Sequence, residues 1–100
     1  MKNFRTFELA VSFYRQSRGL PLKGHLKDQL NRAASSIVLN LAEGRGKQTL
    51  KEQKRFFYIS LGSLRECQAI LILEGFENRE EWKTLDRVGA NLYRLIERAC

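Results

Sequence analysis

Hydrophobic residues recur at helical spacing along almost the whole chain, and no stretch alternates hydrophobic and polar residues as a β-strand would. The pattern predicts four amphipathic helices, at about Phe4–Ser17, Leu26–Glu43, Thr49–Glu74 and Asn78–Ala99. Because only short segments join them, neighbouring helices should run antiparallel. We therefore expect an all-α protein, an up-down-up-down antiparallel four-helix bundle in which residues 1–100 form a single domain.

Local signals indicate where these helices begin and end. The segments Thr49–Glu52 and Asn78–Glu81 have the spacing of capping boxes, which satisfy the free N–H groups of a first helical turn. Gly44 or Gly46 should end the second helix in a left-handed conformation, and Gly75 should end the third.

The helical faces divide the hydrophobic residues into a core set and a remainder. On the first helix, Phe4, Phe7, Val11 and Tyr14 are expected to face the core, and on the third the core line should include Gln68. Five further residues fall outside the stripes that one bundle core requires: Leu9, Phe13, Leu39, Ile59 and Ile70. We predict that they contact identical subunits, because heterologous contacts can close a homo-oligomer into a ring.

Charge is distributed unevenly along the chain. The net charge is +7, with 18 Lys and Arg against 11 Asp and Glu. Residues 1–55 hold 12 of the cations and 4 of the acids, whereas residues 56–100 hold 6 and 7. Solubility alone does not require this asymmetry, so the sequence favours an anionic partner.

The cations are densest where the second predicted helix passes into the third. We expect phosphate groups to contact Arg32, Arg45, Lys47, Lys51, Lys54 and Arg55. Tyr58 shares their side of the third helix and offers a surface for base stacking. A second outer stripe on the fourth helix consists of Lys83, Arg87, Arg94 and Arg98. The alternative is that these side chains only form solvated faces.

No arrangement of residues points to catalysis. The segment Gly44–Thr49 lacks both the first glycine and the Ser or Thr after the lysine that a phosphate-binding loop requires, and a helix precedes it. His25 is the only histidine, so neither a catalytic triad nor a metal cluster can be assembled around it. Asn40 and Glu43 are better explained as a polar network that sets helix register. We expect no enzymatic activity, no metal and no cofactor.

The two cysteines, Cys67 and Cys100, have no second ligand pair nearby, which is typical of free thiols in a cytosolic chain. No hydrophobic run approaches the roughly 20 residues that span a bilayer. The first residues lack the apolar stretch and cleavage site of a signal peptide. We expect a cytoplasmic protein without a membrane partner.

The second and third predicted helices resemble the small bacterial four-helix-bundle proteins of the 23S ribosomal RNA intervening-sequence type. The residues that carry the resemblance are Leu26, Gln29-Leu30, Arg32-Ala33-Ala34, Ser36-Ile37, Asn40-Leu41-Ala42-Glu43-Gly44, Phe56-Phe57, Ser60, Gly62-Ser63-Leu64 and Glu66. The segment Phe4–Val11 fits the first helix of that family, and the last helix matches only in pattern. Arg65-Glu66-Cys67 replaces the acidic-leucine-acidic run that is more usual there.

The resemblance implies a pentameric ring of bundles with no known enzymatic activity. It also implies kinship with the accessory variability protein of diversity-generating retroelements, a basic pentameric barrel that binds a reverse transcriptase and nucleic acid. We therefore predict a non-enzymatic, homo-oligomeric bundle that binds RNA or DNA through phosphate contacts. The alternative prediction is a protein-interaction scaffold, such as an accessory subunit of a retroelement reverse transcriptase.

Overall fold

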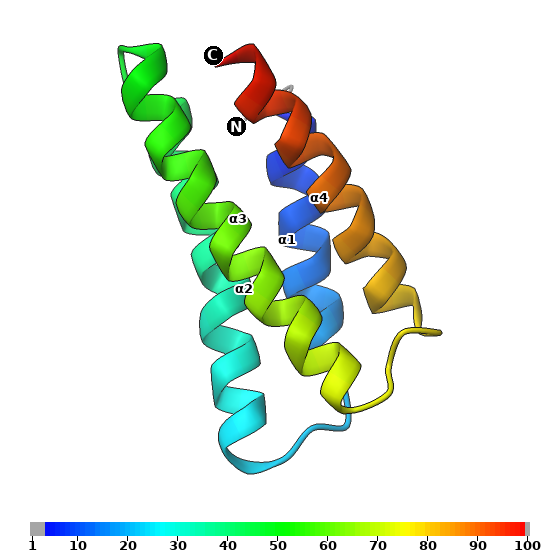
Figure 1. Ribbon diagram of the computed structural model, residues 1–100. Helices are drawn as coiled ribbons and strands as arrows, with labels where there is room; N and C mark the ends of the chain where they lie inside the picture. Colours follow the sequence, from blue (N-terminus) through cyan, green and yellow to red (C-terminus); the bar gives the residue numbers. More distant parts are fainter. Residues whose placement is uncertain (1–3, 100) are drawn as a thin grey trace.

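Four α-helices make up the fold, as the sequence pattern predicts (Figure 1). The computed structural model describes residues 4–99, and no β-strand occurs among them. The helices are α1 (Arg5–Ser17), α2 (Gly24–Arg45), α3 (Leu50–Leu73) and α4 (Glu80–Arg98). The predicted boundaries differ from these by two residues at most.

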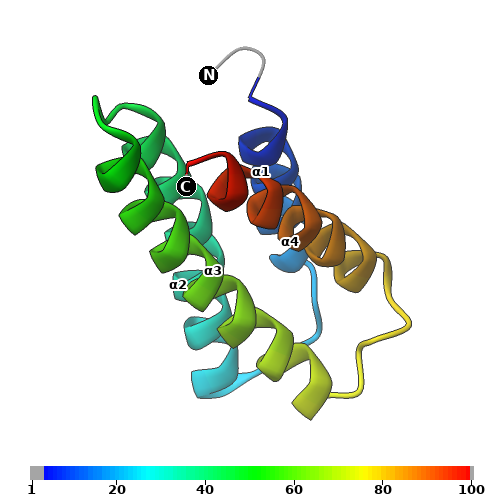
Figure 2. The same cartoon turned by 45° about the horizontal axis from the view of Figure 1, so that its top comes forward.

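The helices pack in chain order around one core, so that α1 contacts α2 and α4, and α3 contacts the same two helices. This arrangement confirms the four-helix bundle, which measures 40 × 22 × 21 Å. The start of α1, the α2–α3 turn and the last turn of α4 lie at the same end of the molecule (Figures 1 and 2). We call this end the termini end.

Two of the four predicted helix signals are confirmed and two are wrong. The Glu52 amide N–H donates to Thr49 Oγ1 over 3.2 Å, which caps the start of α3. Gly75 follows α3 with a left-handed φ of 71°. The predicted capping box at Asn78 does not form, because Arg79 occupies the N-cap position and no side chain caps α4. Glu81 instead forms an ion pair with Arg79, with 3.3 Å between Glu81 Oε1 and Arg79 Nε.

The prediction that Gly44 or Gly46 ends α2 in a left-handed conformation is wrong. The helix continues through Gly44 to Arg45, and Gly46 has a right-handed φ of −82°. Gly44 is buried against Phe57 of α3, so a glycine stands there because the two helices approach closely.

The buried face of α1 differs from the predicted one. Leu9 and Phe13 are only 5% and 1% exposed and belong to the core, whereas Phe7 and Tyr14 pack at its edge. Leu9 and Phe13 are therefore wrong as outer-face residues. The reason is that α1 packs on both α2 and α4, so the middle of its buried face lies between the directions of these two helices.

The same geometry corrects α3, which packs between α2 and α4. Ile70 is buried at 4% exposure, so its predicted place on a subunit surface is also wrong. Cys67 is fully buried, whereas the predicted core residue Gln68 is only partly buried. Of the five predicted interface residues, Leu39 and Ile59 remain exposed, at 65% and 41%.

Hydrogen bonds from polar side chains set the register of α2 against α3. Ser60 Oγ donates to the Ile37 carbonyl over 3.0 Å in the buried interface, and Ser63 Oγ lies 2.8 Å from Ser36 Oγ. Asn40 Nδ2 donates to the Ser36 carbonyl over 2.9 Å, which supports the structural interpretation of Asn40. Glu43 does not join this network, because its side chain is exposed and pairs with Lys47.

Among the described residues, α3 is the one helix that is long and apolar enough to cross a membrane. A core helix of a globular bundle passes the same test, and α3 buries its hydrophobic face against α2 and α4. Its first two turns also carry Lys51, Glu52, Lys54 and Arg55. These observations fit a core helix.

Candidate nucleic-acid interface

The first turns of α3 bring together several of the cations that the sequence singled out. Lys51 and Arg55 are exposed, and Lys54 is partly buried. Tyr58 follows one turn later with 52% of its surface exposed, and the Lys54 Nζ atom lies 5.9 Å from the centroid of its ring. The predicted combination of cations with an accessible aromatic ring is therefore present on one helix.

Lys47 lies in the α2–α3 turn, before the first residue of α3. The Gln53 side chain holds this turn by donating to the Lys47 carbonyl over 3.0 Å. Lys47 Nζ is 3.3 Å from a Glu43 carboxylate oxygen, which offsets part of its charge. Lys47 and Arg55 both lie over the Phe56 ring, at 5.2 and 5.4 Å from its centroid. That shared ring keeps Lys47 beside the cations of α3.

The other predicted phosphate contacts point elsewhere. Arg45 turns toward α1, with its guanidinium carbon 4.4 Å from the centroid of the Phe4 ring. Arg32 is exposed, but it precedes Arg45 by 13 residues on α2, which corresponds to about 20 Å along the helix. Arg65, which shares the side of α3 that carries the cations, donates to the Tyr93 hydroxyl of α4 over 2.7 Å. The structure therefore separates Arg32 and Arg45 from the cations at the start of α3.

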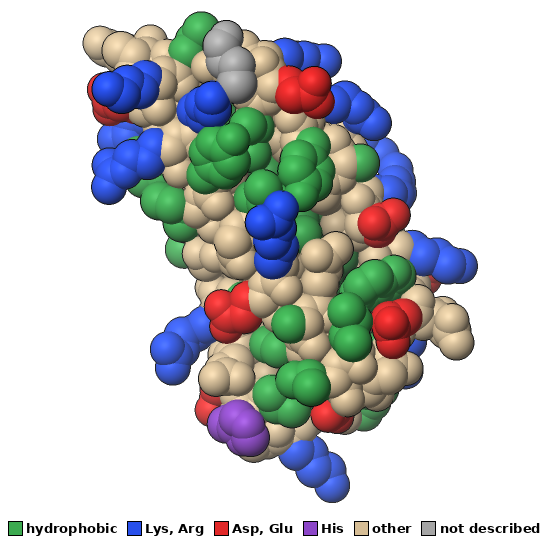
Figure 3. Space-filling view, in the orientation of Figure 1, with side chains coloured by type: hydrophobic (Ala, Val, Ile, Leu, Met, Phe, Trp, Pro, Cys, Tyr) green, Lys and Arg blue, Asp and Glu red, His purple; other side chains and the backbone are tan. Residues whose placement is uncertain are grey.

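A second group of cations, which the sequence analysis did not connect, meets at the termini end. Arg5, Arg45, Arg94 and Arg98 line one surface cavity of about 260 Å³. An adjoining cavity of about 290 Å³ shares Arg45 and Arg98 and extends toward Leu50 of α3. Figure 3 shows Lys and Arg side chains at the upper left and along the upper right edge of the molecule.

The antiparallel topology was the signal that could have revealed this group. In an up-down-up-down bundle the first residues of α1 and α3 lie beside the last residues of α2 and α4. Cations at positions 5, 45, 94 and 98 must then converge, although they are far apart in sequence. Within residues 4–99, none of these four arginines lies within ion-pair distance of a carboxylate.

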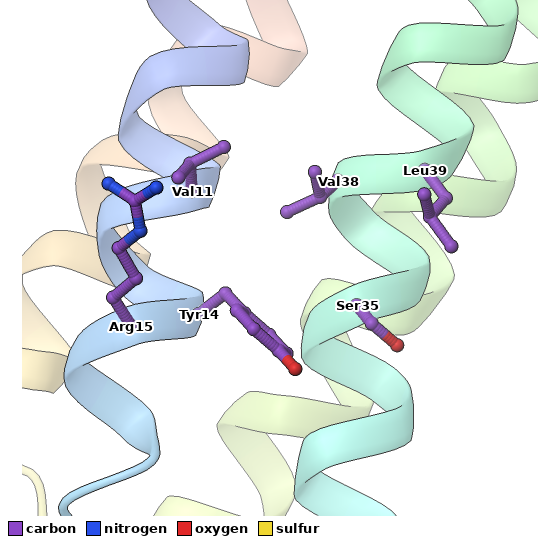
Figure 4. A pocket seen from close by; sticks show the side chains of 6 residues that line it. All are labelled: Val11, Tyr14, Arg15, Ser35, Val38 and Leu39. Carbon is purple, nitrogen blue, oxygen red and sulfur yellow. The ribbon is translucent and has the colours of Figure 1, made fainter.

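A hydrophobic groove of about 320 Å³ runs between α1 and α2 (Figure 4). Val11 and Tyr14 of α1 line it together with Val38 and Leu39 of α2, and Arg15 and Ser35 lie at its edges. Leu39 is one of the two predicted interface residues that remain exposed. The groove is a candidate contact surface for another protein chain.

Two observations bear on metal and thiol chemistry in the described residues. Between Phe4 and Ala99, no three His, Cys, Asp or Glu side chains group as metal ligands would. Burial, with a smaller contribution from Glu66, raises the pKa of the Cys67 thiol from 9.0 to about 12. Such a thiol is a poor nucleophile at neutral pH. Cys100, the other predicted free thiol, lies outside the described residues.

Comparison with protein families places this geometry in context. The family model of the 23S rRNA-intervening sequence proteins matches residues 4–95. The chain belongs to this family. The resemblance noted above lay mainly in the second and third helices. The family match extends it to residues 4–95, from Phe4 into α4. No curated protein matches this intervening-sequence protein.

Proposed function

We propose that this 23S rRNA-intervening sequence protein is a non-enzymatic, basic, oligomeric bundle that binds RNA or DNA through phosphate contacts. The observation that carries the proposal is the cluster at the start of α3, where Lys51 and Arg55 project from one capped helix. Lys47 and Lys54 flank them, and Tyr58 supplies an exposed ring beside them. The protein acts in the cytoplasm and has no membrane partner.

A rigid basic surface suits a polyanion for two physical reasons. Cations on one helix keep their spacing without ordering a loop, so less conformational entropy is lost on binding. Each phosphate that they neutralise releases condensed counterions, which favours binding most strongly at low salt. The aromatic ring adds stacking on any base, so the binding is tolerant of sequence.

We further propose that identical subunits assemble into a closed ring, the pentamer that the family resemblance implies. The groove between α1 and α2 and the exposed Leu39 and Ile59 supply hydrophobic contact surface. A ring would repeat the basic surface around its circumference and strengthen its field. Sedimentation equilibrium at micromolar concentration tests this part, and a monomer would contradict it.

The experiment that tests nucleic-acid binding compares two charge reversals of equal size. The variant Lys51→Glu/Arg55→Glu changes the proposed surface, whereas Lys23→Glu/Lys27→Glu changes exposed cations near the start of α2, at the opposite end of the bundle. Fluorescence anisotropy with a labelled single-stranded oligonucleotide measures the affinity of each. We expect the first variant to lose binding and the second to keep most of it. Equal losses in both variants would mean that only net charge matters and that the α3 surface is not the site.

A second candidate function is a scaffold for another protein, such as a retroelement reverse transcriptase. The hydrophobic groove favours it, because a groove lined by Val11, Val38 and Leu39 fits a protein side chain better than a phosphate. Neighbouring genes discriminate the two roles. A reverse transcriptase gene with a repeated template beside this gene would favour the scaffold.

A further inference from the structure

We propose that Arg5, Arg45, Arg94 and Arg98 form a pocket for a phosphate monoester, the terminal phosphate of a nucleic-acid strand. The inference rests on the proposed nucleic-acid binding and names the chemical group that is recognised at the termini end. The cations of α3 contact internal phosphates, and the arginine pocket holds the end of the strand.

Three helices build the pocket. Arg5 comes from the first turn of α1, Arg45 from the last turn of α2, and Arg94 and Arg98 from the last turns of α4. Thr6 and Asn91 add polar groups to the lining, and Phe4 and Leu95 form its hydrophobic wall. Among the described residues that line the cavity, none is acidic, so the charge that they contribute is positive only.

Part of the pocket is already held in position. The Arg45 guanidinium lies 4.4 Å from the centroid of the Phe4 ring, and Phe4 is itself only 3% exposed. The Phe4 ring stacks on Phe7 with 6.1 Å between centroids, which fixes the platform beneath Arg45. A guanidinium that rests on a fixed ring loses less freedom when an anion binds.

Helix dipoles do not account for all four arginines. Cations are favourable at the C-terminal ends of helices, which explains Arg45 of α2 and Arg98 of α4. Arg5 is the first residue of α1, where a cation is unfavourable. Arg94 and Arg98 are also four residues apart on one helix, a spacing at which like charges repel. An anion bound between them would offset both costs.

The charge and the size of the cavity favour a terminal phosphate over an internal one. A phosphodiester carries one negative charge, whereas a monoester carries about 1.5 to 2 at neutral pH, which four guanidinium groups match better. The cavity of about 260 Å³ is smaller than the roughly 300–1,000 Å³ of pockets that enclose drug-sized ligands. It therefore suits a phosphate group better than a whole nucleotide.

The test uses two strands that carry equal numbers of phosphates. One is an oligonucleotide with a 5′-phosphate, and the other has one more nucleotide and hydroxyl groups at both ends. Anisotropy titrations compare their affinities for the full chain and for Arg94→Gln/Arg98→Gln. Arg87→Gln, an exposed cation on α4 that does not line the cavity, is the control for charge removal. A 3′-phosphorylated strand tests the other end, and circular dichroism checks that each variant folds.

We expect the full chain to prefer a phosphate-ended strand by roughly tenfold, the size of one good charge-assisted hydrogen bond. The double variant should lose this preference, and Arg87→Gln should retain it. Should the double variant not fold, Arg45→Gln on α2 is measured in its place with the same expectation.

Equal affinity of the full chain for all strands would overturn the inference while nucleic-acid binding stands. A preference that survives removal of the pocket arginines would also overturn it. Failure of every strand to bind would overturn the proposed function and the inference together.

Discussion

Gly44 of α2 and Phe57 of α3 are in contact at a point where no side chain fits between the helices. A Cβ atom on Gly44 would lie 2.8 Å from Cε1 and 3.0 Å from Cδ1 of the Phe57 ring. Phe57 is 3% exposed and belongs to the core. The glycine that the sequence analysis assigned to the end of a helix is therefore a packing residue inside it.

Gly44→Ala should destabilise the bundle, because the new methyl group must displace a buried aromatic ring. We expect the free energy of unfolding to fall by about 1–3 kcal/mol, as for other overpacked cores. Gly62→Ala is the matched control, since Gly62 is exposed within α3 and a Cβ there would meet nothing within 4 Å. That change should raise stability by up to about 1 kcal/mol through helix propensity. Urea denaturation at one protein concentration measures both, and equal effects of the two substitutions would contradict the packing argument.

Affinity for an oligonucleotide should fall steeply as salt is added, because released counterions drive the binding. Lys51→Gln should weaken binding and reduce the slope of log affinity against log salt by about 1 for the phosphate contact that it loses. Lys27→Gln, on α2 near the opposite end of the bundle, is the control and should leave the slope unchanged. Titrations over a series of chloride concentrations give these slopes. A wild-type affinity that stays flat from low to physiological salt would show that phosphates are not the contact.

Leu39→Glu should reduce the mass of the assembly without unfolding the subunit. Leu39 is 65% exposed in the single chain, so a carboxylate costs little there, but it would lose hydration inside a hydrophobic contact between subunits. Leu73→Glu is the control, because Leu73 is 72% exposed at the opposite end of the bundle from the α2–α3 turn. Sedimentation velocity compares the variants. An unchanged mass for Leu39→Glu would show that Leu39 is not part of the subunit interface.

The Cys67 thiol should make stability depend on pH in the alkaline range. Its pKa is about 12 in the folded protein against an ordinary value of 9.0. Below pH 9 the thiol keeps its proton in both the folded and the unfolded protein, so the stability that this group contributes is fully present. Between these values the unfolded chain loses the proton while the folded one keeps it. The free energy of unfolding therefore falls as the pH rises, by at most about 1.4 kcal/mol per pH unit.

The measurement is made in a Cys100→Ser background, in which Cys67 is the only thiol. Urea denaturation on either side of pH 9 is compared with the same series for Cys67→Ala. All other ionisable groups are the same in both proteins, so the difference between the two slopes belongs to Cys67. Parallel slopes would mean that the thiol is not protected by burial.

The sequence by itself determined the local features of this protein. Hydrophobic spacing sets the four helices, and the Thr49 cap marks the start of α3, because both depend on residues a few positions apart. The cluster of Lys51, Lys54 and Arg55 was visible for the same reason, since one helix places neighbouring residues on a common side.

Tertiary structure alone decided which arc of each helix is buried. Helical spacing says that a stripe is hydrophobic but not how two neighbouring helices share it, so Leu9 and Phe13 lie in the core. Only packing brings Arg5 to Arg98 and Arg45, because antiparallel helices join chain segments that are distant in sequence.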